Sequence, residues 1–254
     1  MIEVKGIQKS FGDVQVLKGI TTTFEAGKTS LIIGQSGAGK TVFLKSLLGL
    51  HIPEVGTIEY NGKRNIDMTI EDKREFRQEL GMVFQGSALF DSLNVEENVM
   101  FPLKMFTKQK RKKMLQRVNE VLQRVDLKDS NKKFPAELSG GMQKRVAIAR
   151  AIVMKPKYLF CDEPNSGLDP STSILIDNLI KEITEEYQIT TVINTHDMNS
   201  VMEIGDKIVF LQNGLKAWEG SSKEIFKTEN KAVTDFVYSS NLFKKVRTAY
   251  LNDN

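Results

Sequence analysis

A short glycine-rich segment constrains the fold of this chain more than any other feature. Residues 34–41 read GQSGAGKT; they follow the apolar run 30–33 and precede a stretch with helical spacing, 40–48. Glycines in the pattern G-x-x-x-x-G-K-T let successive backbone N–H groups turn toward a phosphate, and the next helix points its positive end there. An apolar strand, a glycine loop and a helix therefore predict an α/β core that binds a nucleotide.

This loop supplies most of the expected nucleotide contacts. Lys40 is expected to reach the β- and γ-phosphates, and the Thr41 hydroxyl is expected to bind Mg²⁺. A glycine turn without function is the simpler alternative, and the flanking strand and helix argue against it. The residues expected to bind nucleotide here are Gly34, Gln35, Ser36, Gly37, Ala38, Gly39, Lys40, Thr41 and Val42.

A pair of carboxylates ends a second apolar run, 158–161. Ligands gather at the carboxyl edge of open α/β sheets, so Asp162 is expected to hold Mg²⁺ there. Glu163 is placed to orient and deprotonate an attacking water, a role typically worth roughly 10²–10⁴ in rate. The alternative is a pair of acids at a helix N-terminus, because Pro164 follows. Cys161, inside the run, is interpreted as a small buried apolar residue.

A second glycine-rich element, Leu138-Ser139-Gly140-Gly141-Met142, precedes a helix-like stretch, 142–153. Ser139 is a plausible N-cap, so taken alone this element is equally well an ordinary capped helix. Four further residues are singled out, and three of them have plain interpretations when taken singly: Gln85 as a surface amide, His196 as a loop histidine and Phe11 as a core aromatic. The four residues are Gln85 after the strand-like 81–84, Asp169 in the segment 166–169, His196 after the strand-like 190–194, and Phe11 on the first hairpin.

Composition narrows the class of protein. The chain has 254 residues, 40% of them apolar and 27% charged, which fits one large domain or a domain with a subdomain. A net charge of +4 is too mild to indicate a nucleic-acid partner, and we expect none. The single cysteine excludes an internal disulfide and fits a reducing compartment. We expect no signal peptide and no spanning segment, so a membrane partner would have to supply the spanning helices.

Hydrophobic patterns predict the order of the elements. Residues 1–67 indicate mostly strands, and roughly 84–156 indicate mostly helix, including an amphipathic helix around 118–125. Further strands are expected at 158–161, 190–193, 207–211 and 215–218, with a crossover helix at 174–187 and a type I′ turn at Asn213-Gly214. The pattern predicts one α/β core that carries a helical insertion, with an antiparallel sheet beside it.

Taken together, these motifs resemble the nucleotide-binding subunit of an ABC transporter, over about residues 1–225. The resemblance implies an ATPase with an α/β fold: a P-loop NTPase core of mostly parallel sheet flanked by helices, an antiparallel β subdomain, and a helical signature subdomain at about 86–156. Residues 226–254 would form a C-terminal helical extension. Phe236, Val237, Leu242, Phe243 and Val246 give this extension apolar anchors, which could pack on its own core or reach a partner subunit.

The resemblance also assigns roles. Phe11 would stack on adenine, Gln85 would contact Mg²⁺ and sense the γ-phosphate, and His196 would contact the γ-phosphate. Ser139, Gly140 and Gly141 would cap the ATP of a second copy, and Asp169 would lie with Ser139 at that dimer interface. The implied catalytic set is Glu163, His196 and Gln85; the implied Mg²⁺ set is Thr41, Gln85 and Asp162.

The subfamily is indicated by residues 84–95 (FQGSALFDSLNV), by Met142 in place of Gln, and by Pro102-Leu103. These are similar to Mla/Mce-type lipid transporters, although Ala38 departs from the Cys or Ser often found at that position. This similarity implies a peripheral subunit on the cytoplasmic face of a bacterial inner membrane. Its integral-membrane permease would move phospholipid between inner and outer membranes and connect to a lipid-binding Mce-type protein.

One alternative function stays open: an ABC ATPase that acts mechanically, without moving a substrate, in a cell-division or lipoprotein-release complex. Two interpretations also stay open for the basic run 108–113: a solvated helix face, or a surface for anionic lipid headgroups.

Overall fold

The structure is a computed structural model that describes residues 1–64 and 67–238. The chain divides into two compact units, Met1–Met68 with Val192–Asn254, and Thr69–Thr191. Each unit is described by itself below. Three of the predicted C-terminal anchors, Leu242, Phe243 and Val246, lie outside the described residues.

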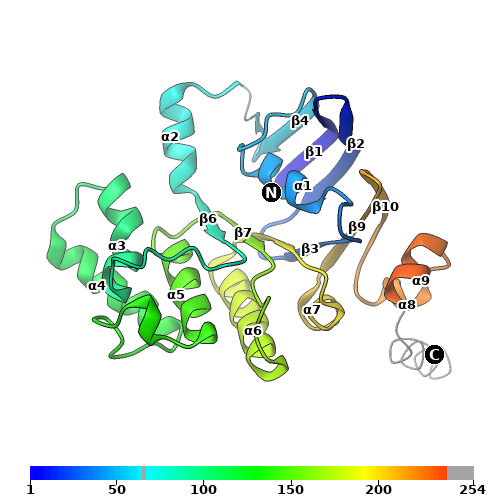
Figure 1. Ribbon diagram of the computed structural model, residues 1–254. Helices are drawn as coiled ribbons and strands as arrows, with labels where there is room; N and C mark the ends of the chain where they lie inside the picture. The colour runs from blue at the N-terminus through cyan, green and yellow to red at the C-terminus, as the bar shows by residue number, and fades with distance from the viewer. Residues whose placement is uncertain (65–66, 239–254) are drawn as a thin grey trace. The chain divides into compact units, whose positions relative to one another are not determined.

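The first unit contains an antiparallel sheet in the order β2-β1-β4-β5 (Figure 1). Its strands are β1 (Ile2–Phe11), β2 (Val14–Phe24), β4 (Val55–Tyr60) and β5 (Lys63–Arg64). Ile2, Val4 and Ile7 of β1 are buried, as expected for a sheet with one face on the core. The sequence-based strands in this region are confirmed, and β1 and β2 extend further than predicted.

The same unit contributes most of a second sheet. In it β3 (Thr29–Ile33) pairs in parallel with β9 (Lys207–Gln212), and β9 pairs antiparallel with β10 (Leu215–Gly220). Next to β3 lies β8 (Thr190–Asn194), which crosses the boundary between the units. The turn from β9 to β10 has positive φ at Asn213 (52°) and Gly214 (80°), which confirms the expected type I′ geometry.

Within the residues described for this unit, four helices accompany the strands: α1 (Lys40–Leu47), α7 (Met198–Ile204), α8 (Glu224–Lys227) and α9 (Lys231–Val237). The last two pack on their own unit. The Phe236 ring lies 5.2 Å from the Phe210 ring, and Tyr238 Oη donates to the Ile225 carbonyl at 2.9 Å. Self-packing is therefore the arrangement of the C-terminal segment as far as Tyr238.

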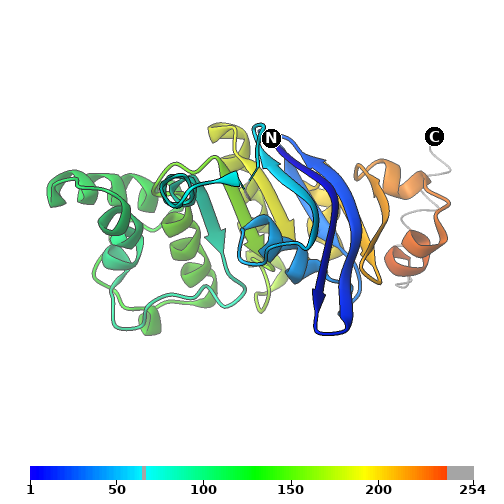
Figure 2. The ribbon, with the colours of Figure 1, turned by 90° about the horizontal axis from the view of Figure 1, so that it is seen from above.

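The second unit pairs β6 (Leu80–Val83) in parallel with β7 (Tyr158–Asp162). Its helices are α2 (Ile70–Gln78), α3 (Val95–Phe106), α4 (Arg111–Arg124), α5 (Gly140–Ile152) and α6 (Pro170–Tyr187), with a 3-10 turn η2 (Pro135–Glu137). In both ribbon views α3, α4 and α5 form one group (Figures 1 and 2). The predicted amphipathic stripe on α4 is buried in this group.

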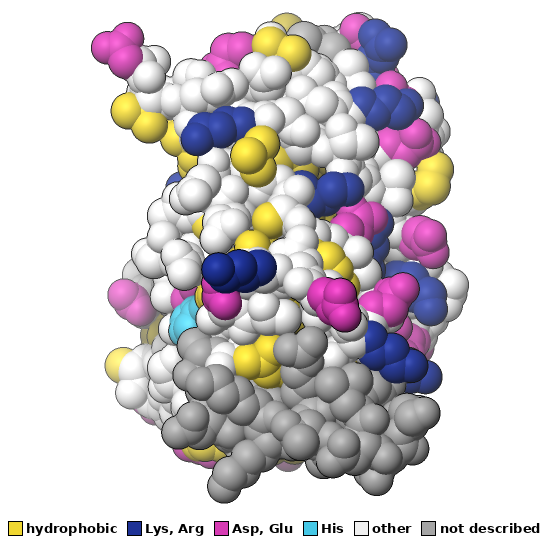
Figure 3. Space-filling view, turned by 90° about the vertical axis from the view of Figure 1, so that its right-hand side faces the viewer, with side chains coloured by type: hydrophobic (Ala, Val, Ile, Leu, Met, Phe, Trp, Pro, Cys, Tyr) yellow, Lys and Arg dark blue, Asp and Glu magenta, His cyan; other side chains and the backbone are white. Residues whose placement is uncertain are grey.

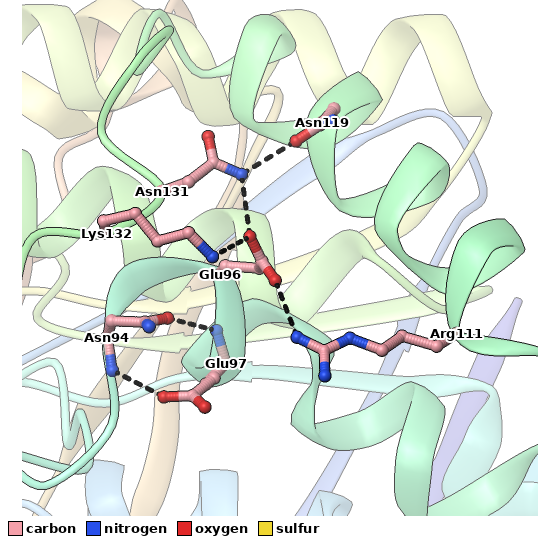
Figure 4. Close-up of polar contacts among 7 residues, drawn as sticks. All are labelled: Asn94, Glu96, Glu97, Arg111, Asn119, Asn131 and Lys132. Carbon is pink, nitrogen blue, oxygen red and sulfur yellow. Dashed lines mark hydrogen bonds and ion pairs between the residues drawn. The ribbon is translucent and has the colours of Figure 1, made fainter.

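Charged and amide side chains fix the start of α3 (Figure 4). Asn94 and Glu97 form a reciprocal capping box there. The Glu96 carboxylate is 4% exposed and lies 3.1 Å from Lys132 Nζ and 3.6 Å from Arg111 Nη2. One buried acid thus joins α3 to the start of α4 and to the loop before η2. Residues 108–113, the basic run, are exposed, which fits both a solvated face and a surface for anionic headgroups.

Among the described residues, no helix combines the length and the apolar character that crossing a membrane requires. The face drawn in Figure 3 shows Lys and Arg side chains interspersed with Asp and Glu. Charges of mixed sign are typical of an ordinary solvated surface.

Candidate nucleotide-binding site

The phosphate loop curls around the side chain of Lys40. Its Nζ donates to the Gly34 carbonyl at 2.8 Å and to the Gln35 carbonyl at 3.1 Å. Three glycines have positive φ: Gly34 (148°), Gly37 (79°) and Gly39 (99°), the last of which is the N-cap of α1. Left-handed backbone at these positions turns the loop back on itself, as the sequence pattern predicts.

The β9–β10 hairpin supports this loop from within the same unit. A Cβ on Gly34 would lie 2.2 Å from the Leu211 carbonyl oxygen, so only glycine fits at the start of the loop. The Gly214 N–H also donates to the Ala38 carbonyl at 3.3 Å. Sequence reasoning did not connect the turn to the loop, because the two are far apart in the chain.

The first turn of α1 meets the end of β8. Asn194 Nδ2 donates to Thr41 Oγ1 at 3.4 Å, and the Asn194 side chain is buried. Asn194 was not predicted as a site residue, although an amide that ends an otherwise apolar strand is a signal for one. His196, two residues later, is exposed. The structure thus brings the segment that carries His196 toward the predicted Mg²⁺ ligand Thr41.

The Phe11 ring is held from the side at the end of β1. It is 45% exposed, its centroid lies 5.1 Å from that of His51 in an edge-on arrangement, and Lys9 Nζ lies 5.2 Å from its centroid. Lys9 is in turn bonded to Glu54, and this bond lowers the pKa of the Glu54 carboxyl. The exposed part of the Phe11 ring is available for stacking on a base. Neither His51 nor Lys9 was predicted to contribute.

In the second unit, the acids after β7 meet the segment after β6. Gln85 Nε2 donates to Glu163 Oε2 at 2.9 Å and to Ser166 Oγ at 3.4 Å. Glu163 has a left-handed backbone, with φ of 46°. Because α6 begins only at Pro170, the alternative of an acid pair in the first turn of a helix is wrong. The structure therefore brings together two of the predicted catalytic residues.

Cys161 is fully buried inside β7, as interpreted from the sequence. Burial is the main reason that the pKa of its thiol is raised, and Asp177 and Asp162 nearby add to the effect. A thiol held in its neutral form is a poor nucleophile. Cys161 is therefore a core residue.

The second glycine-rich element begins α5. Ser139 is its N-cap and accepts the Met142 N–H at 3.3 Å, as predicted. The first turn of this helix carries no acidic side chain. A Cβ on Gly141 would lie 2.6 Å from Cγ2 of Thr172 in α6, so α5 and α6 approach closely at this point.

Asp169 caps α6 beside this close approach. It accepts the Thr172 N–H at 3.0 Å and the Ser171 hydroxyl at 2.5 Å. These hydrogen bonds, that from Ser171 first, hold the pKa of Asp169 well below its usual value. Asp169 therefore stays ionised at any physiological pH.

The predicted Mg²⁺ ligands suit that ion chemically. Thr41, Gln85 and Asp162 would supply hydroxyl, amide and carboxylate oxygens, which are the hard donors Mg²⁺ prefers. Within the described residues, no three His, Cys, Asp or Glu side chains gather as a metal site.

The family profile described as "ABC transporter" matches residues 17–166. This chain belongs to the ABC transporter family. Among the ABC relatives, the probable ribonucleotide transport ATP-binding protein mkl of Mycobacterium leprae is 39% identical over 236 residues, 93% of this chain and 68% of that protein. The methionine import ATP-binding protein MetN of Clostridium tetani is 41% identical over 226 residues, 89% of this chain and 71% of that protein.

Solved ABC structures share the fold. A dimeric structure of the cassette MJ0796 gives a TM-score of 0.79 at 30% identity, covering 87% of this chain and 99% of that one. A second MJ0796 dimer, with ADP and phosphate bound, gives the same values. The cbiO1 protein of Clostridium perfringens gives a TM-score of 0.83 at 30% identity over 98% of this chain and 97% of that one. The predicted fold class is confirmed, and the chain is the ATP-hydrolysing subunit of an ABC transporter.

Proposed function

We propose that this subunit powers a permease that moves phospholipid between the inner and outer bacterial membranes, working on the cytoplasmic face of the inner membrane. ATP would close two copies of the chain into a symmetric pair with two composite sites. The observation that carries the dimer is the start of α5, where Ser139 caps a helix whose first turn has no acidic side chain. Such a helix end favours the γ-phosphate of a nucleotide held by another copy.

The roles proposed for the site residues follow the resemblance to ABC subunits. Lys40 and the loop glycines would hold the phosphates, and Phe11 would stack on the base. Thr41, Gln85 and Asp162 would hold Mg²⁺, which supplies charge neutralisation for the transferred phosphoryl group. His196 would contact the γ-phosphate and Asp169 would lie at the interface between copies.

Glu163 is the proposed base. Its carboxylate already accepts the Gln85 amide at 2.9 Å, so the two residues act as one polar group. Hydrolysis removes the γ-phosphate and its charge-assisted contacts, each worth roughly 1.5–3 kcal/mol. The loss of several contacts can supply the ~5.5 kcal/mol that turns a 99:1 equilibrium into 1:99, and this change would reopen the dimer and drive the permease.

Phospholipid is proposed on the residues 84–95 and on Met142, which are similar to Mla/Mce-type transporters. The names of the relatives do not agree on a substrate, since mkl is named for ribonucleotide and MetN for methionine. Because the chain is about equally identical in sequence to mkl and to MetN, the proposal of a substrate depends on these local residues. A lipid-binding Mce-type protein would be reached through the permease.

Affinity capture of the chain from native membranes, followed by lipid and protein analysis, tests this proposal. We expect a permease and enriched phospholipid. Capture with a division-site or lipoprotein-extracting complex instead, or enrichment of methionine or ribonucleotide, would overturn it.

A further inference from the structure

Side chains of the helix α5 donate hydrogen bonds to backbone carbonyl oxygens of the segment that follows β6. Lys144 Nζ donates to the Gln85 carbonyl. Further along the same helix, Arg150 donates to the Ser87 and Ala88 carbonyls, both at 2.7 Å. Ser87 and Ala88 have positive φ, 61° and 47°, a backbone conformation that costs energy for residues with a Cβ. Two cations on one helix therefore hold a strained loop in place.

Lys144 is the unexpected member of this pair. Its residue is only 4% exposed, whereas lysine is seldom buried without a partner. Burial is the main reason that the pKa of Lys144 is lowered, with Cys161 and Glu163 acting in the opposite direction. An apolar side chain of similar size often stabilises a protein as well as a buried charge does, or better. Within the part of the chain that the structure describes, the one hydrogen bond that the Lys144 ammonium group is seen to donate goes to the Gln85 carbonyl.

Gln85 links Lys144 to the proposed base. Its carbonyl is bound by α5, while its side-chain amide is bound by Glu163 and Ser166 in the segment after β7. The two ends of one residue are thus fixed by two different elements of the same unit. A shift of the Gln85 backbone changes where its amide can reach.

We propose that Lys144 is a positioning residue for Gln85: by holding the Gln85 carbonyl, it fixes the reach of the Gln85 amide toward Glu163. The inference rests on the roles proposed for Gln85 and Glu163. It makes the helix that begins with Ser139 the support of the catalytic amide as well. The helix that caps the partner's nucleotide is then linked, through Lys144 and Gln85, to Glu163, which orients the attacking water.

Lys144→Met tests this directly, because methionine keeps most of the length of the side chain and removes the donor. We expect kcat for ATP hydrolysis to fall roughly 10–100-fold, as for a misplaced catalytic group, with KM for ATP within about twofold of wild type. Lys144→Gln, which keeps a neutral donor, should lose less. Arg145→Met is the matched control on the same helix, since Arg145 bonds Asp126 instead, and its kcat should be unchanged.

A double-mutant cycle shows whether Lys144 acts through Gln85. In a Gln85→Ala background, Lys144→Met should reduce kcat by no more than about twofold further. An unchanged kcat in Lys144→Met, or the same loss in both backgrounds, would overturn the inference. Wild-type turnover in Gln85→Ala and Glu163→Gln would instead show that the site itself is misassigned. Activity lost in those two variants but kept in Lys144→Met would refute the role of Lys144 alone.

Discussion

A methyl group added at Gly141 should reveal how closely α5 approaches α6. In Gly141→Ala, the new Cβ would lie 2.6 Å from Thr172 Cγ2, whereas carbon atoms in contact are normally about 3.5–4.0 Å apart. The helices must separate by roughly 1 Å or the Thr172 side chain must move by as much, and overpacking of this kind typically costs about 1–3 kcal/mol. Alanine offsets part of this loss, because it favours helix over glycine by up to about 1 kcal/mol.

The matched variant is Thr172→Ser, which removes Cγ2 and keeps the hydroxyl. In that background the alanine has room, so Gly141→Ala should be neutral or stabilising. Urea denaturation of the four proteins gives the coupling free energy, and we expect about 1–3 kcal/mol.

Gly140→Ala is the control, since its Cβ would meet only the movable end of Leu168 at 3.3 Å. It should cost less than Gly141→Ala. A coupling free energy below about 0.5 kcal/mol between positions 141 and 172 would refute the close approach as the reason for glycine at 141.

Three further predictions follow from the site and the core. Glu163→Gln should bind ATP but hydrolyse it at least ~10²-fold more slowly in a phosphate-release assay; near wild-type turnover would remove it as the base. Lys40→Ala should weaken ATP binding itself, measured by calorimetry, and an unchanged affinity would mean that the loop is misassigned. Burial raises the pKa of Tyr158 to about 12. As the pH rises, the unfolded chain therefore loses the phenol proton at a lower pH than the folded chain, and the free energy of unfolding should fall between about pH 10 and pH 12. Tyr158→Phe should unfold with a shallower pH dependence in that window, and equal slopes would contradict the shift.

Local signals gave reliable predictions where one turn or one cap decides the structure. Asn213-Gly214 forms the expected hairpin, and Ser139 caps its helix. The helix α2 was missed, because Phe76 is its single buried residue and gives no apolar period. Its capping box, Thr69 with Asp72, was a signal that could have found it.

Long-range contacts could not be predicted from residue types. Gln85 and Glu163 were each selected by motif, but their hydrogen bond joins residues 78 apart in sequence. Lys144 was not selected from the sequence, because lysine is usually exposed, and only the fold shows that it is buried. His51 beside Phe11 has no sequence signal, since a lone histidine after a helix is usually a loop residue.

The central claim is that ATP joins two copies of this chain through Ser139. Light scattering of Glu163→Gln tests it most directly, because slow hydrolysis should trap the closed state. With Mg²⁺ and ATP, the mass should rise from that of one chain, 28.7 kDa, to that of two, and Ser139→Arg added to the same protein should abolish the rise. An unchanged mass with ATP, or a pair that forms equally well with Ser139→Arg, would contradict the account.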